Sequence, residues 1–198
     1  ASKEIVIQMI NSVTNIDIKD IYNSNALIIE TKEDMPALNT YHSNGKFYID
    51  VINSKMEYNQ GLMGKIDLDK EGIKSYEFKQ LDTKTSDKYE PSDRVTQIIL
   101  TLSDDKSPED VYVEEVDNKI FAYVSGNPLN GFEYVKKSQS ESKLDISFLE
   151  NGDYNLIQQG NIVELNFDKS LLDIESLELN IEDQIVEKIN ISESLGKH

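Results

Sequence analysis

The histidine, cysteine and carboxylate content limits the catalytic chemistry open to this chain. There is no cysteine, which excludes thiol nucleophiles, disulfides and thiolate metal sites. His42 is the only internal histidine, and neither a zinc-site pattern nor a Ser or Cys nucleophile signature accompanies it. Adjacent acids such as Asp104-Asp105 and Glu114-Glu115 are expected by chance among 37 acidic residues. The sequence therefore predicts no catalytic residues and a protein that is not itself an enzyme.

One acidic segment, from Asp67 to Gly72, imitates the start of an EF-hand calcium loop. The twelfth position of such a loop carries a bidentate Glu, and here that position is Phe78. Without the closing ligand, a turn that leads into a strand is the better interpretation. The sequence predicts no metal site and no cofactor.

Aromatic and guanidinium side chains offer binding chemistry instead. Tyr48, Tyr76 and Tyr123 lie in predicted strands, and alternation would turn Tyr48 and Tyr123 away from the apolar core. An exposed row of tyrosines could stack on sugar rings and donate hydrogen bonds. Arg94, the single arginine, could bind a carboxylate bidentately. Two alternatives stay open. The tyrosines could be present only because tyrosine favours strands, and Arg94 could form a structural ion pair with a nearby acid.

The elements that would position these side chains are strands. The run from Asp93 to Leu102 is rich in β-branched residues and alternates. One face carries Ile98, Leu100 and Leu102, and the other carries Gln97, Ile99 and Thr101. The run from Lys119 to Val124 alternates as well. The Asp117-Asn118 pair before it tolerates positive φ and suits a tight hairpin. The resulting unit is a strand followed by a hairpin.

This strand–hairpin unit occurs three times. One copy runs from Ala26 to Val51 around an Asn44-Gly45 turn, and another runs from Lys143 to Phe167 around a Gly160-Asn161 turn. Each unit leaves an apolar face that it cannot bury alone. The repeats therefore predict an all-β fold: a β-sandwich of two small sheets, with a further related half-copy at the C-terminus.

Composition narrows the class of partner. The net charge of −17 opposes nucleic acid, whose phosphates need a basic surface, and also opposes adhesion to anionic lipid. No apolar run approaches the ~18 residues of a membrane span. The chain begins at Ala1 without an initiator Met, so we expect that an upstream piece, such as a secretion signal, was removed.

The order of elements from Ile16 to Val124 resembles the AMIN domain, a module found beside bacterial N-acetylmuramoyl-L-alanine amidases and some secretins. The matching segments are Ile16-Asp17-Ile18, Ala26 to Thr31, Lys46 to Val51 with its Asp, Gly72-Ile73 to Gln80, Asp93-Arg94-Val95 to Leu102, and Lys119 to Val124. Arg94 falls at the family's Arg. The resemblance implies a sandwich of two small sheets that anchors enzymes to peptidoglycan.

Two departures from the family pattern matter. The loop from Leu81 to Ser92 is longer than the family norm. The segment from Lys143 to Ile191 resembles the first half of a second copy whose remainder is absent. This segment either completes the fold differently or belongs to a divided domain.

These observations predict three parts: residues 1–14 as a leader or strand, 15–131 as an AMIN-like sandwich, and 140–192 as a second, incomplete unit. The expected function is a non-catalytic, extracytoplasmic bacterial module that binds peptidoglycan and localises an amidase or envelope complex. The candidate ligand-binding residues are Arg94, Tyr48, Tyr123 and Tyr76. The alternative is a protein-interaction module that pairs with a partner through exposed strand edges.

Overall fold

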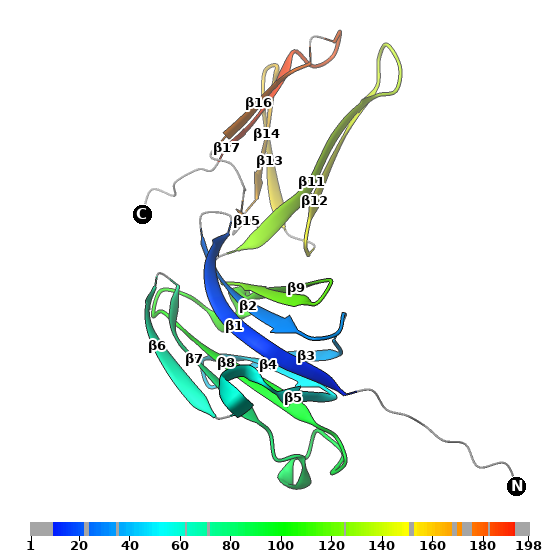
Figure 1. The fold of residues 1–198 in the computed structure, drawn as a ribbon. Coiled ribbons are helices and arrows are strands. Elements are labelled where there is room, and N and C mark those ends of the chain that lie inside the picture. Colours follow the sequence, from blue (N-terminus) through cyan, green and yellow to red (C-terminus); the bar gives the residue numbers. More distant parts are fainter. Residues whose placement is uncertain are drawn as a thin grey trace, which may run out of the picture.

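The chain is all-β, as the sequence predicts. The computed structural model describes residues 10–21, 24–34, 36–61, 63–70, 72–124, 126–150, 153–167, 170–171, 176–181 and 183–192. Most of the segment 1–14 therefore lies outside the described residues, and β1 begins at Asn11. Two five-stranded sheets lie face to face, and hairpins formed by the later strands extend away from them (Figure 1).

The first sheet has the order β5-β1-β2-β10-β9. Its strands are β1 (Asn11–Ile21), β2 (Ser24–Thr31), β5 (Ser54–Met56), β9 (Tyr112–Val116) and β10 (Lys119–Tyr123). The second sheet has the order β3-β4-β8-β7-β6. Its strands are β3 (Leu38–Ser43), β4 (Lys46–Ile52), β6 (Gly64–Lys70), β7 (Ile73–Gln80) and β8 (Val95–Leu102). In the described part of the chain, the connections contain short 3-10 turns at Tyr58–Gly61, Thr83–Thr85 and Pro108–Asp110.

The core lies between the two sheets and is formed by the predicted alternating positions. β8 is the central strand of its sheet, and Ile98, Leu100 and Leu102 all point into the core. From the other sheet, Ile120 and Ala122 meet them. Burial of this many branched side chains is the main stabilising term, at about 1.5–3 kcal/mol for each one.

Tight turns with positive φ close the hairpins. Asn44 and Gly45 have φ values of 51° and 71°, and Asp117 has a φ of 55°. These values suit a two-residue connection whose twist matches that of the flanking strands. The turns therefore set the register of β3 on β4 and of β9 on β10.

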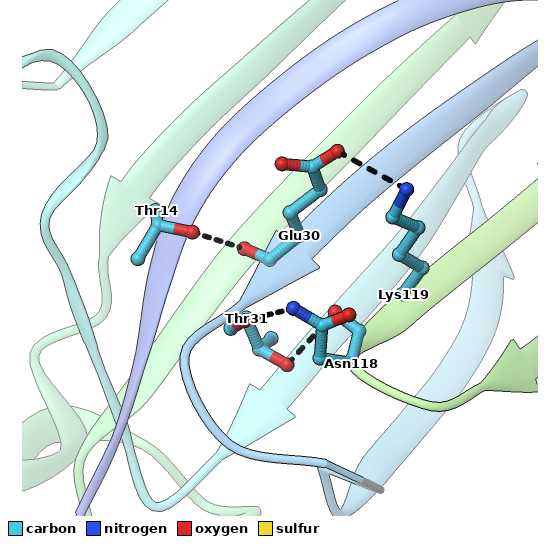
Figure 2. Close-up of polar contacts among 5 residues, drawn as sticks. All are labelled: Thr14, Glu30, Thr31, Asn118 and Lys119. Carbon is cyan, nitrogen blue, oxygen red and sulfur yellow. Dashed lines mark hydrogen bonds and ion pairs between the residues drawn. The ribbon is translucent and has the colours of Figure 1, made fainter.

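A set of polar contacts ties the β9–β10 turn to the end of β2 (Figure 2). The side-chain amide of Asn118 donates to the carbonyl oxygen of Thr31 over 2.9 Å, and the Thr31 hydroxyl donates to the carbonyl oxygen of Asn118 over 3.2 Å. Beside them, Lys119 and Glu30 form an ion pair at 3.6 Å, and the Thr14 hydroxyl donates to the Glu30 carbonyl over 3.2 Å. These contacts join β1, β2 and β10 at one end of the first sheet.

The C-terminal strands form smaller sheets. In the described part of this region, the strands pair in the orders β12-β11-β15, β13-β14 and β16-β17. The strands are β11 (Asn127–Lys136), β12 (Ser142–Phe148), β13 (Tyr154–Gln159), β14 (Ile162–Phe167), β15 (Ser170–Leu171), β16 (Ser176–Asn180) and β17 (Lys188–Ser192). β11 continues past residue 131, and residues 137–141 turn it back into β12, so the predicted gap between the two units lies within one hairpin. The division into domains stays a prediction.

Candidate functional site

The outer face of the second sheet carries a cluster of polar and aromatic side chains. The hairpin turn at Asn44-Gly45 places Asn39 opposite Asp50 and Tyr41 opposite Tyr48. On the other side of β4, Gln97 of β8 lies opposite Asp50. Since alternate residues of β4 point into the core, Tyr48 and Asp50 share the face that is turned away from it. We call the residues Asn39, Tyr41, Tyr48, Asp50, Lys88, Tyr89 and Gln97 the outer-face cluster.

Asp50 is a fully buried carboxylate at the centre of this cluster, with 0% of its surface exposed. Its Oδ2 accepts a hydrogen bond from the Tyr89 hydroxyl at 2.6 Å, and its Oδ1 accepts one from Gln97 Nε2 at 2.8 Å. Asn39 Nδ2 in turn donates to the Tyr89 oxygen over 2.9 Å. A buried charge is costly unless it is hydrogen-bonded, and both oxygens of Asp50 have such partners.

The long loop from Leu81 to Arg94 brings Tyr89 over the sheet. Its 3-10 turn is capped by Asp82, whose Oδ1 accepts from the amide of Lys84 at 3.1 Å. The buried Thr83 hydroxyl donates to the carbonyl of Asp93 over 2.9 Å and closes the base of the loop. Burial, reinforced by the charge of Asp50, raises the pKa of Tyr89 to about 12. Tyr89 therefore stays protonated and donates to Asp50 at neutral pH.

Tyr41 and Tyr48 form a parallel aromatic pair beside Asp50. Their ring centroids are 4.7 Å apart and their planes differ by 2°. Lys88 Nζ lies 3.1 Å from the centroid of the Tyr41 ring, so Tyr41 is held between a ring and a cation. Burial and the charge of Asp50 raise the pKa of Tyr41, whose hydroxyl accepts from Gln97 Nε2 at 3.2 Å.

Arg94 is exposed and stands just before β8. Its backbone carbonyl accepts from the amide of Ser54 at 2.9 Å, which fixes the main chain while leaving the side chain on the surface. Ile99 is paired with Tyr48. Arg94 is five residues before it, roughly 17 Å along the strand at 3.3 Å per residue. Arg94, which precedes the sheet, is therefore too far from Tyr48 for both side chains to contact the same small group.

The predicted row of exposed tyrosines does not form. Tyr76 is only 3% exposed and packs in the core, because a bulge between Ile73 and Ser75 shifts its face. Tyr123 does point away from the main core, as alternation predicts, but it is only 4% exposed. It packs with Ala26 in a small second cluster on the other sheet, and its hydroxyl donates to Glu114 at 2.9 Å. The expectation that Tyr76 and Tyr123 are exposed was wrong.

Two sequence signals could have identified the residues that were missed. The Asn44-Gly45 turn predicts the cross-strand pairs of Tyr41 with Tyr48 and of Asn39 with Asp50 by counting outward from the turn. Asp50 also stands between Ile49 and Val51 in an apolar strand, where a charge needs a partner. No local pattern in the loop indicated that Tyr89 is that partner.

In the outer-face cluster, the buried Asp50 and Gln97 hold the partly exposed Tyr41 and Tyr89 in place. Asn39, Tyr48 and the exposed Lys88 lie beside them. These groups suit recognition of a polar ligand with an apolar face, such as a sugar ring or an amide. Among the residues that the structure describes, no group of three or more histidine or acidic side chains is placed to hold a metal ion. In the same residues, no helix is long and apolar enough to cross a bilayer. No protein-family model, curated protein or solved structure matches this chain.

Proposed function

We propose that this protein is a non-catalytic, extracytoplasmic module that binds peptidoglycan and localises an N-acetylmuramoyl-L-alanine amidase or an envelope complex. The observation that carries the proposal is the parallel Tyr41–Tyr48 pair beside hydrogen-bonding groups on the outer face of the second sheet. Tyrosine rings can stack on sugar rings, and because the Tyr41 ring lies between Tyr48 and Lys88, the stacking face in this proposal is the side of Tyr48 turned away from Tyr41. The partly exposed hydroxyls and the Asn39 amide beside it would bind N-acetyl and hydroxyl groups. The AMIN-like order of strands supports the choice of peptidoglycan.

The proposed binding set differs from the one that the sequence suggested. Tyr48 and Arg94 remain in it, because Tyr48 is in the outer-face cluster and Arg94 is exposed. Tyr41 and Lys88 replace the buried Tyr76 and Tyr123. In this arrangement Arg94 would bind a carboxylate of the peptide stem bidentately, some distance from the sugar bound at Tyr48.

Sedimentation with purified sacculi tests this function. The protein should be retained above a neutral control protein, and Tyr48→Ala should lower retention several-fold at moderate ionic strength. Tyr154→Ala is the matched control, because Tyr154 is an exposed tyrosine on β13. Equal retention of the native protein and the neutral protein would end the proposal, and equal losses with both variants would remove Tyr48 from the site.

A second candidate function is protein interaction through strand edges. It is favoured by the sheets β13-β14 and β16-β17, which are paired only within their own hairpins in the described part of the chain. Size-exclusion chromatography with light scattering distinguishes the two functions. A stable dimer would favour strand-edge pairing, whereas a monomer that binds sacculi would favour glycan recognition.

A further inference from the structure

The second unit repeats the strand order of the first. β11 and β12 correspond to β1 and β2, the β13–β14 hairpin to β3–β4, β15 to β5, and the β16–β17 hairpin to β6–β7. In the first unit, β5 pairs in parallel with the start of β1, with Ser54 opposite Asn11. In the second unit, β15 pairs in parallel with the start of β11, with Ser170 opposite Asn127.

Finer details recur at equivalent positions. The amide of Lys32, just after β2, donates to the carbonyl of Ser12 over 2.9 Å. The amide of Leu149, just after β12, donates to the carbonyl of Pro128 over 3.0 Å. β1 and β11 also each carry a register shift close to their first residues. Shared irregularities of this kind indicate one architecture built twice, since bulges are specific features of a fold.

The second unit differs from the first in what completes its sheets. In the first unit, β8 lies between β4 and β7 and pairs antiparallel with both, while β10 pairs with β2. Among the described residues of the second unit, β14 pairs only with β13, β17 only with β16, and β12 only with β11. β14 and β17, which correspond to the two neighbours of β8, therefore each have one edge that is unpaired among the described residues.

Among the described residues no strand takes the place of β8 in the second unit, and the expected core face of β14 is exposed. Counting outward from the two hairpin turns, Val163, Leu165 and Phe167 of β14 take the places of Phe47, Ile49 and Val51 of β4. The three residues of β4 are buried. Val163 is instead 60% exposed, and Leu165 and Phe167 are only partly covered. An isolated two-stranded hairpin is marginally stable in water, so the β13–β14 hairpin needs a further strand to pair with it.

The exposed edge of β14 lacks the features that normally prevent strand addition. Between Tyr154 and Phe167 the single charged residue is Glu164, in a chain that is 29% charged. Natural edge strands usually carry charged residues or proline, which hinder pairing with a further strand. β8, which fills the equivalent place in the first unit, also has no charged residue from Val95 to Leu102. A neutral edge beside an apolar face is suited to a neutral, alternating strand.

We propose that β14 and β17 accept a partner β-strand with the chemistry of β8, antiparallel to both. The partner is an uncharged segment of about seven or eight residues, the length of an ordinary strand, with apolar side chains at every second position. Those side chains lie beside Val163, Leu165 and Phe167 on the same face of the sheet, as Leu100, Ile98 and Thr96 lie beside Phe47, Ile49 and Val51 in the first unit. This inference rests on the second candidate function and specifies its site.

A synthetic peptide that reproduces residues 93–124 tests the proposal, because this segment contains β8, β9 and β10. Hydrogen–deuterium exchange of the full chain should slow at the amides of β14, β17 and β12 when the peptide is added. Exchange in β4 and β7 should stay unchanged, since their own β8 is in place. A peptide with Ile98→Asp and Leu100→Asp is the negative control.

Two neighbouring substitutions give a matched pair. Val163→Asp puts a charge beside the apolar side chains of the partner strand, and should weaken peptide binding at least tenfold. Ile162→Asp puts the charge on the opposite face, at the position that Lys46 occupies in the first unit, and should leave peptide binding unchanged. Both side chains are more than half exposed, so neither change removes a buried contact.

The outcomes separate this site from the broader function. If the peptide protects none of these strands, the β8-like site is wrong. If the chain dimerises without peptide and the dimer protects β14, the occupant is a second copy, which overturns the proposed partner but keeps strand-edge interaction. If the chain is monomeric and the peptide does not bind, both the β8-like site and the strand-edge function are wrong.

Discussion

The Tyr89 hydroxyl donates to the Asp50 carboxylate over 2.6 Å, although the two residues are 39 positions apart in the sequence. This contact fastens the loop between β7 and β8 onto the outer face of the second sheet. It also satisfies one oxygen of a fully buried charge. The loop and the candidate binding surface are therefore parts of one hydrogen-bonded structure.

Removal of the Tyr89 hydroxyl should destabilise the protein. Tyr89→Phe leaves Asp50 Oδ2 buried without its donor, at a cost of about 1–3 kcal/mol in the free energy of unfolding. Urea denaturation followed by circular dichroism measures this cost. Tyr154→Phe, at an exposed position, is the control and should change stability little. An unchanged midpoint for Tyr89→Phe would show that the loop does not depend on the bond.

Stability should fall at alkaline pH because of Tyr89. Its pKa is about 12 in the folded protein, above its ordinary value of 10.0, so the unfolded chain loses this proton first. The contribution of Tyr89 is fully present below pH 10 and is lost as the pH rises through about 12. Burial also raises the pKa of Tyr76, which acts in the same direction. Unfolding curves between these pH values should show a shallower decline for Tyr89→Phe than for the native protein, and identical declines would contradict this account.

Gly64 on β6 should not tolerate a side chain. A Cβ at this position would lie 2.5 Å from Cζ of Phe78, which is buried in the core. Gly64→Ala must displace the Phe78 ring, so we expect a loss of about 1–3 kcal/mol. Thermal denaturation measures it. In a background of Phe78→Leu, whose smaller side chain leaves room, the cost of Gly64→Ala should shrink, and an equal cost in both backgrounds would mean that the ring is not the obstacle.

The Asn118 side chain should stabilise the β9–β10 turn. Asn118→Ala removes the 2.9 Å hydrogen bond to the Thr31 carbonyl, and an ordinary hydrogen bond contributes about 1 kcal/mol. Chemical denaturation measures the loss. Asp117→Asn, at the adjacent exposed position with positive φ, should have almost no effect. Equal effects of the two substitutions would assign the stabilisation to turn geometry and not to the side-chain bond.

Much of the first sandwich could be predicted from local patterns. Alternation correctly placed Ile98, Leu100 and Leu102 on the core face of β8, because successive side chains of a strand point to opposite sides. The Asn44-Gly45 turn was sufficient to set the register of its hairpin, since a two-residue loop leaves one way to pair the flanking strands.

Tertiary contacts decided which of the tyrosines are accessible. Alternation states which side of a strand a residue occupies, not what covers that side. Tyr123 points away from the main core, as predicted, yet Ala26 and its neighbours bury it. The slip in alternation after Ile73 does predict the bulge that puts Tyr76 on the core face, but Tyr89 reached Asp50 along a loop path that no periodicity encodes. Strand faces follow from backbone geometry within a few residues, whereas coverage and loop position depend on partners far away in the chain.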